Sequence, residues 1–376
     1  MSAHLYIHTP FCRSKCLYCD FYSVPGRQIA WGRFVDALLA EAQERREELP
    51  SSPDTIYIGG GTPSLMPLRE VERMLDGVRE IFGNGAEETT IELNPDDVTA
   101  EYVNSLVDYG VNRFSMGVQS FNDDVLRFLR RRHNAEQALK AAQLLIEGGR
   151  NVSLDLIFGL PGQSLRQWER DVATAVELRP SHISCYALML EEGTPLTRMV
   201  ENGEVEVPDQ ELSALMYEHL RQALGKAGYE HYEISNYALP GYHSRHNSAY
   251  WTGAPYLGLG PGAHSYDGSM MRRFNPADKE GYMKRYADGI GGYRPVEEVL
   301  GVEDLAHEYL LTRLRTARGM NPYKWLEMTP NADRDSCRKA LEREIAKGNL
   351  TSTEEGRVRI PASLWLTADP VISALF

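Results

Sequence analysis

The sequence predicts an α/β protein built on a parallel β-sheet, because short apolar segments alternate with longer amphipathic ones over the first 190 residues. The apolar segments are rich in β-branched and aromatic residues, as buried strands are. The expected strands are 5–9, 55–59, 90–94, 113–118, 153–159 and 182–188. Strands that alternate with helices form parallel sheets with right-handed crossovers. Either a doubly wound sheet or a barrel fits this pattern.

Amphipathic segments fill the intervals between these strands. The expected helices lie near 32–48, 68–82, 100–109, 122–131, 134–148 and 165–178, with a further helix over 209–228. Asn134 and Ser164 are typical N-cap residues, and Gly110 and Pro180 lie where helices should have ended. Functional residues are therefore expected where the strands end, since parallel sheets place their sites at the carboxyl ends of strands.

The composition and the hydrophobic periodicity of the sequence change towards the C-terminus. Residues 240–276 are rich in Gly, Pro and aromatic residues and show little periodicity, so an irregular segment is expected there. Two helices over 302–317 and 333–347, followed by two short strands around Gly356, predict a small winged-helix-like tail.

Composition excludes several classes of protein. The 376 residues are 42% apolar and 25% charged, as in globular proteins. The net charge of −13 weighs against nucleic-acid binding, and the basic run 130–132 is expected to be a solvated helix face. The chain starts without a secretory signal pattern and has no apolar run of about 18 residues. We therefore expect a cytoplasmic protein without a membrane span.

Three of the five cysteines lie close together after the first strand, at Cys12, Cys16 and Cys19. In a reducing compartment such a group predicts a metal site rather than disulfides. Three thiolates fill three corners of a [4Fe–4S] cube and leave the fourth iron open to a small molecule. A zinc site is the alternative, but structural zinc needs four ligands and no second pair lies nearby. Cys185 and Cys337 are expected to be small buried hydrophobic residues.

A glycine run, GGGTPS over 59–64, follows the second strand. Glycines allow the backbone to approach a ligand closely and to direct N–H groups at it. The run lacks the Lys-Ser/Thr pair of a nucleotide-binding P-loop. Beside the cysteine loop, it predicts a site for the amino-acid end of a small cofactor.

Four polar residues lie in the other strands, at their ends or on a following helix: Glu92, Gln119, Arg131 and Asp155. A buried acid must be paired or hydrogen-bonded, and one interpretation is therefore that Glu92 and Asp155 are structural partners within the sheet. Alternatively, they bind the hydroxyl and ammonium groups of a cofactor, and Arg131 binds a carboxylate. Both interpretations stay open.

Several motifs occur in a fixed order: YIHTPFC (6–12), GGGTPS (59–64), MGVQSF (116–121) and DLIFGLPGQS (155–164). Over nearly the whole chain they resemble the oxygen-independent coproporphyrinogen dehydrogenase branch of the radical-SAM superfamily. The resemblance implies a partial (β/α)6 barrel, a C-terminal α+β extension and the winged-helix-like tail.

The expected parts of the chain are a core barrel over 1–230, an extension over 231–300 and a C-terminal domain over 301–376. The resemblance further implies that Cys12, Cys16 and Cys19 bind a [4Fe–4S] cluster with S-adenosylmethionine on its fourth iron. The implied contacts of S-adenosylmethionine are Tyr6, Tyr18, Gly60, Gly61, Thr62, Glu92, Gln119, Arg131, Asp155 and Ala187.

The sequence departs from the dehydrogenase after the third cysteine. There the dehydrogenase continues Cys-x-Cys, whereas Cys19 is followed two positions later by Phe21. The chain is also short before its first strand. Residues 246–251 instead fit the HNxxYW motif of the related HemW-type haem chaperones. The resemblance to these chaperones implies haem as a further ligand.

His246, in that motif, is the implied ligand of the haem iron. Imidazole ligates iron and aromatic faces pack on the macrocycle. The alternative is a core histidine whose nitrogens are already bonded. His231, His243 and His264 are the other candidate ligands.

Three functions follow from these observations. The first is a haem chaperone, monomeric or dimeric, that passes haem to an acceptor haemoprotein. The second is an oxidoreductase that decarboxylates the propionates of coproporphyrinogen III through a 5′-deoxyadenosyl radical, which Phe21 and the short N-terminus disfavour. The third is nucleic-acid modification, which the acidic charge disfavours.

Overall fold

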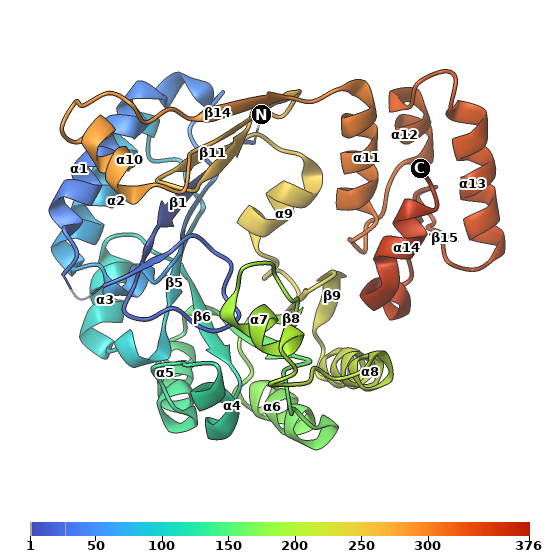
Figure 1. Cartoon of the computed structure of the whole chain (residues 1–376), viewed down its shortest axis with the longest axis horizontal. Helices are drawn as coiled ribbons and strands as arrows, with labels where there is room; N and C mark the ends of the chain where they lie inside the picture. Colours follow the sequence, from blue (N-terminus) through green and yellow to red (C-terminus); the bar gives the residue numbers. More distant parts are fainter. Residues whose placement is uncertain (1, 27) are drawn as a thin grey trace.

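Six parallel strands lie side by side in chain order at the centre of the fold (Figure 1). The computed structural model describes residues 2–26 and 28–376. The strands are β1 (His4–Thr9), β4 (Thr55–Gly60), β5 (Glu88–Leu93), β6 (Arg113–Gln119), β7 (Asn151–Phe158) and β8 (His182–Ala187). All six predicted strands are confirmed. In the part of the chain that the structure describes, β1 and β8 do not pair, so the barrel is partial.

Helices connect consecutive strands, as predicted. They are α1 (Trp31–Glu44), α2 (Leu68–Phe82), α3 (Ala100–Asp108), α4 (Asp123–Phe128), α5 (Ala135–Glu147) and α6 (Leu165–Leu178). The side chains of Asn134 and Ser164 accept backbone N–H groups in capping boxes, which confirms both N-caps. The helix expected near 122–131 stops at Phe128, because Arg130 adopts a left-handed backbone with φ of 59°.

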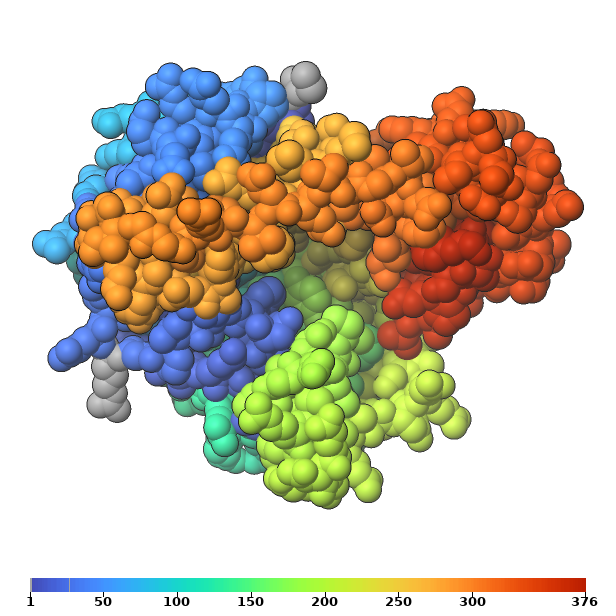
Figure 2. All heavy atoms as spheres, turned by 45° about the horizontal axis from the view of Figure 1, so that its top comes forward, coloured from blue at the N-terminus to red at the C-terminus, as the bar shows by residue number. Residues whose placement is uncertain are grey.

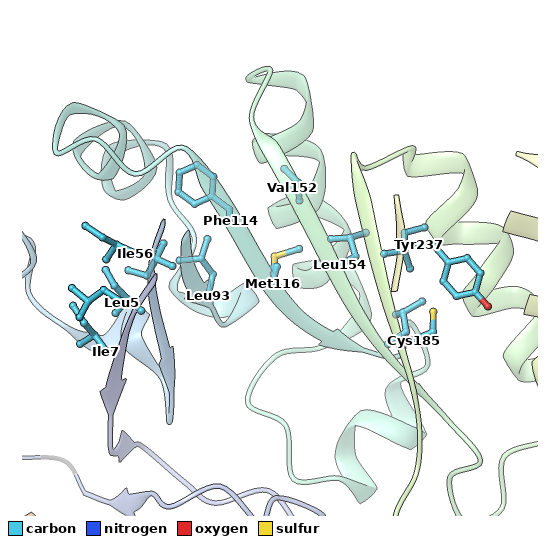
Figure 3. Close-up of a cluster of buried hydrophobic side chains, with 14 of the residues drawn as sticks. Leu5, Ile7, Ile56, Leu93, Phe114, Met116, Val152, Leu154, Cys185 and Tyr237 are labelled. Carbon is cyan, nitrogen blue, oxygen red and sulfur yellow. The ribbon is translucent and has the colours of Figure 1, made fainter. Parts of the chain in front are cut away.

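The two faces of the parallel strands differ in chemistry. The outward face packs under the helices through apolar side chains, as Figure 3 shows for Leu5, Ile56, Phe114 and Leu154. Neighbouring residues point to the opposite face of a strand, so the inward face has a different set of side chains. The inward side chains include His4, Tyr6, His8, Glu88, Thr90, Glu92, Arg113, Ser115, Ser153, Asp155, His182 and Ser184. The barrel interior is therefore polar, unlike the aliphatic interior of a filled barrel.

The segment after the barrel was expected to be irregular over 240–276, and that prediction is wrong. Residues 240–276 contain α9 (Arg245–Thr252), β11 (Tyr256–Leu259), β12 (His264–Tyr266) and β13 (Met271–Phe274). They are flanked by β9 (Glu230–Glu233) and β10 (Asn236–Ala238) before them and by α10 (Lys279–Tyr286) and β14 (Val296–Val299) after them. β11 pairs in parallel with β1, and β10 pairs antiparallel with β8. Such short strands depend on pairing with a sheet edge, which local periodicity does not reveal.

The remaining elements form the tail and the connections. They are β2 (Phe11–Cys12), β3 (Val24–Pro25), α7 (Pro195–Glu201), α8 (Gln210–Lys226), α11 (Val302–Arg313), α12 (Pro322–Met328), α13 (Arg334–Ala346), β15 (Thr351–Ser352), β16 (Val358–Arg359) and α14 (Ala368–Ser373). β15 and β16 form the hairpin predicted around Gly356, whereas α12 and α14 were not predicted. The tail lies across the molecule from α1 and α2 (Figure 1).

The tail contacts residues of α8 and β9, which follow the barrel strands. Tyr217 of α8 donates a hydrogen bond from its hydroxyl to the carbonyl of Ala362 at 2.6 Å. The ring of His231 packs edge-on against Trp365 with 4.4 Å between ring centroids. No described helix is both long and apolar enough to cross a membrane.

We expect Phe114→Ala to lower the free energy of unfolding by about 3–5 kcal/mol, because it leaves a cavity between the sheet and its helices. Phe114 is 0% exposed, whereas Tyr323 on α12 is 76% exposed. The control Tyr323→Ala should change the free energy by about 0.5 kcal/mol or less. Denaturant unfolding of both variants measures this difference, and equal losses would contradict the assignment of the core.

Candidate functional site

A cavity of about 430 Å³ opens at the carboxyl ends of the parallel strands, where the sequence placed the functional residues. The cysteine loop after β1 and the glycine run after β4 form one part of its wall. The predicted site residues that line it are Cys12, Cys16, Tyr18, Cys19, Gly60, Gly61, Thr62, Glu92, Gln119, Arg131, Asp155 and Ala187. Tyr6 and His246 lie outside this wall.

The three cysteines of the loop are free thiols with polar neighbours. Thr62 Oγ1 donates to Cys12 Sγ at 3.4 Å, and Arg131 Nη1 donates to Cys16 Sγ at 3.5 Å. Burial and the charge of Cys16 raise the pKa of the Cys19 thiol to about 11. Neighbouring thiolates repel one another and need a positive partner, which a bound iron cluster would supply. The donor set therefore fits such a cluster.

A single metal ion does not match this arrangement. Over residues 2–26 and 28–376, no group of three His, Cys, Asp or Glu side chains is placed to hold one ion. In a [4Fe–4S] cube, by contrast, each of three thiolates binds a different iron.

The glycine run packs directly against the backbone of the cysteine loop. The N–H of Gly61 donates to the carbonyl of Thr9 at 2.8 Å, and the N–H of Thr62 donates to that of Phe11 at 2.7 Å. A Cβ on Gly61 would lie 2.5 Å from the Phe11 oxygen. Gly60 has a φ of 106°, and a Cβ there would meet the His8 ring at 2.5 Å. These glycines therefore allow the second strand to hold the loop at the cavity wall.

The two acids predicted from the sequence both lie on the inward face of the sheet, Glu92 in β5 and Asp155 in β7, with β6 between them. Glu92 accepts hydrogen bonds from Tyr57 Oη and the N–H of Gly60, both at 3.0 Å. Asp155 accepts from the hydroxyls of Ser115 and Ser153, both at 3.2 Å. Burial, reinforced by the neighbouring Asp155, raises the pKa of Glu92 to about 7, and burial raises that of Asp155 to about 6. Both acids are satisfied within the sheet and also line the cavity.

Arg131 joins the cysteine loop to the sheet. Its Nη2 donates to Asn94 Oδ1 at 2.7 Å and to the carbonyl of Gly117 at 2.6 Å, while Nη1 reaches Cys16. Gln119, at the end of β6, has a left-handed backbone with φ of 68°. Such a conformation is uncommon for residues other than glycine and is concentrated at functional sites.

The basic run 130–132 was expected to be a solvated helix face, and the structure differs. Arg131 and Arg132 are partly buried beyond the end of α4, and Arg132 forms ion pairs with Asp96 at 3.2 Å and Asp97 at 2.7 Å. The left-handed turn at Arg130 removes the run from the helix. Periodicity alone gave no sign of this turn.

His246 closes the opposite end of the barrel. It is 1% exposed, and its Nδ1 hydrogen-bonds with Thr55 Oγ1 at 2.7 Å. Its Nε2 hydrogen-bonds with Tyr250 Oη at 2.9 Å, and burial lowers its pKa to about 3. Thr55 begins β4, so His246 lies at the amino ends of the strands, away from the cysteine loop. Tyr6 lies nearby and hydrogen-bonds with His8 Nδ1 at 3.0 Å.

The cavity wall also contains residues that sequence analysis did not single out. Among them are Lys15, Tyr57, Tyr186 and Met189. Tyr186 is in β8 and Met189 follows it, so the rule that functional residues lie at strand ends pointed to them. Their residue types gave no chemical reason to choose them. Cys185 and Cys337 are buried, as predicted.

The sequence model of the protein family described as the Radical SAM superfamily matches residues 6–175 of this chain. "Heme chaperone HemW" of Synechocystis is 39% identical over 85% of this chain and 79% of that protein. The Bacillus subtilis protein of the same name is 33% identical over 98% of each chain. This chain belongs to the HemW family. That membership confirms the resemblance drawn from the motifs.

A solved structure also matches this HemW-family chain. Coproporphyrinogen III oxidase (HemN) from Escherichia coli, a radical SAM enzyme, superposes with a TM-score of 0.81 and 22% identity. The match covers 100% of this chain and 90% of that one. It confirms the predicted partial barrel and, at this identity, shows the fold alone.

We expect Gly61→Ala to prevent the HemW-family protein from holding a full cluster, because the added methyl group would push the glycine run away from Phe11. Iron and acid-labile sulfide after anaerobic reconstitution measure this loss. The matched control is Gly26→Ala in the same region, where a Cβ meets no atom within 4 Å. A full cluster in Gly61→Ala would contradict this account of the packing.

The raised pKa of Glu92 predicts a pH dependence of stability. A carboxyl whose folded pKa exceeds its unfolded value stabilises the fold at low pH and loses that contribution as pH rises through the folded pKa. We therefore expect the free energy of unfolding to fall between about pH 4.5 and 7 more steeply in the wild type than in Glu92→Gln. Denaturant unfolding at several pH values measures both slopes, which would be equal if Glu92 were solvated.

Proposed function

We propose that this protein is a haem chaperone that binds a [4Fe–4S] cluster, S-adenosylmethionine and haem, and passes haem to an acceptor haemoprotein. The observation that carries the proposal is the packing of the cysteine loop on the glycine run at the cavity wall, in a chain of the HemW family. The relatives are named as haem chaperones, and the described residues supply a matching cofactor site.

Each part of the cavity wall has a role in this proposal. Cys12, Cys16 and Cys19 hold three irons of the cluster and leave the fourth open. Arg131 supports the cluster by fixing Cys16 against the sheet and by placing positive charge beside its sulfur. When bound, the reduced cluster supplies the electron that splits S-adenosylmethionine in radical-SAM chemistry.

We propose that S-adenosylmethionine contacts the rest of this wall. The N–H groups of Gly60, Gly61 and Thr62 already donate within the protein, so the glycine run contributes its close backbone approach to the cavity rather than free donors. The carboxyls of Glu92 and Asp155 suit the hydroxyl and ammonium groups of the cofactor. The proposed contacts are Tyr18, Gly60, Gly61, Thr62, Glu92, Gln119, Arg131, Asp155 and Ala187. We assign Tyr6 a supporting role through His8, because it does not line the cavity.

We also propose that three parts of the chain have different roles. Residues 1–230 form the cofactor-binding barrel, residues 231–300 extend both edges of its sheet, and residues 301–376 form a separate tail. The pairing of β11 with β1 and of β10 with β8 supports the role of the middle part.

The position of His246 argues for a structural role in the barrel. Ligation of haem iron would require its hydrogen bonds to Thr55 and Tyr250 to break and α9 to leave the barrel end. The backbone N–H groups of Arg245 and His246 also donate to Glu88, at 3.1 and 3.0 Å. We therefore propose that the histidine of the HNxxYW motif closes the barrel, and that haem binds elsewhere.

An anaerobic haem titration of the cluster-reconstituted protein tests the function. We expect saturable binding of one haem per chain, followed by transfer to an apo-haemoprotein. We expect His246→Ala to keep the haem stoichiometry and to lower the thermal unfolding midpoint, because it removes two buried hydrogen bonds.

Two outcomes would overturn the proposed function. One is haem binding no stronger than to an unrelated control protein. The other is formation of 5′-deoxyadenosine coupled to loss of coproporphyrinogen III, which would indicate the oxidoreductase. Phe21, 61% exposed, stands where that enzyme's pattern has a further cysteine.

A further inference from the structure

The opening of the cavity has an exposed apolar rim. Phe21, Tyr186 and Met189 line the cavity and are 61%, 43% and 69% exposed. Exposed apolar side chains that gather around a cavity are typical of ligand-binding sites, whereas singly exposed ones are ordinary. Each of them comes from the end of a parallel strand or the segment that follows it, so the fold itself gathers them.

Two free cations lie at the same opening. Lys15 and Arg130 are exposed and line the cavity, and the side chain of neither has an ion pair or hydrogen bond with another described residue. The neighbouring Arg127 and Arg132, by contrast, are paired with acids. Asp20 and Glu191 line the same cavity, so the cations do not make the opening positive as a whole. Each unpaired cation can nevertheless pair with a carboxylate of a ligand.

Backbone contacts hold the rim in place. The N–H of Leu17 in the cysteine loop donates to the carbonyl of Leu129 at 3.4 Å, next to Arg130. The carbonyl of Leu17 accepts from the N–H of Leu196 in α7 at 3.0 Å. Figure 2 shows the cysteine loop, dark blue, against the green segment that follows β8. The apolar and basic parts of the rim are therefore linked through one loop.

We propose that haem docks on this rim, with its macrocycle against Phe21, Tyr186 and Met189 and its propionates toward Lys15 and Arg130. Haem is a flat apolar ring with two carboxylates at one edge, which matches both features of the rim. A cargo on the rim is also accessible to an acceptor, unlike a ligand of the buried His246. The inference rests on the proposed function and assigns its haem site.

The test is a haem titration of the cluster-reconstituted protein and of two double variants. Charge reversal in Lys15→Glu with Arg130→Glu is expected to weaken haem binding about tenfold, since two carboxylate contacts are replaced by repulsion. Phe21→Ser with Met189→Ser is expected to weaken it at least as much, because apolar contact area is lost. Iron content confirms that each variant holds its cluster.

Matched controls change the same residue types away from the cavity. Arg127→Glu alters an arginine of α4 whose side chain is 73% exposed, and Leu215→Ser alters an apolar residue of α8 that is 51% exposed. Both controls should bind haem within about twofold of the wild type. Weaker binding in both double variants, with unchanged controls, would support the rim as the haem site.

The outcomes separate the site from the function. If the wild type binds haem and both double variants bind it equally well, the rim is not the site, although the chaperone function stands. Loss of haem binding in His246→Ala, together with wild-type haem binding in both double variants, would also overturn the inference. It would place the haem site at α9. Failure of the wild type to bind haem would overturn the proposed function itself.

Discussion

The close approach of the glycine run to the cysteine loop is the contact on which the rest of the site depends. Without side chains at Gly60 and Gly61, the end of β4 lies against the backbone that leads from β1 into Cys12. Backbone hydrogen bonds, rather than flexible side chains, thereby position the first cysteine relative to the sheet. Arg131 positions the second by joining Cys16 to the ends of β5 and β6. These contacts hold the cysteine loop at one wall of the cavity.

The polar interior of the barrel is the second constraint. Apolar side chains on the outward face bury themselves against the helices and supply the hydrophobic stabilisation. The inward face is free to bear acids, histidines and hydroxyls, provided that they satisfy one another. Glu92 meets this requirement through Tyr57, and Asp155 through Ser115 of the neighbouring strand and Ser153 of its own strand. Their pKa values are raised because the remaining desolvation is only partly offset.

The two ends of the barrel differ, and this difference bears on how a cargo is handled. At the amino ends of the strands, α9 inserts His246 among Thr55, Tyr57 and Tyr250, so both ring nitrogens of His246 are already hydrogen-bonded. At the carboxyl ends the wall opens to solvent. A molecule that must be received and then released needs the open end, since leaving the closed end would break a buried hydrogen-bond network.

Much of this protein was determined by its sequence alone. The six strands, the helices between them and the N-caps at Asn134 and Ser164 follow from local patterning. These features are local, because a period of two or 3.6 residues and a capping side chain act within one element. The predicted residues that line the cavity follow in part from the rule for strand ends and in part from the family resemblance. The family could also be recognised from four short sequence motifs.

Only the tertiary structure decided the features that depend on distant parts of the chain. The strands of 231–300 exist because β1 and β8 offer them edges, and the place of His246 is set by Thr55, which is 191 residues away. The rim that includes Lys15, Phe21 and Met189 is assembled from separate loops. Local sequence patterns do not reveal these contacts, because the sheet brings together segments that are far apart in the chain. The burial and the electrostatic surroundings of each side chain follow from that arrangement.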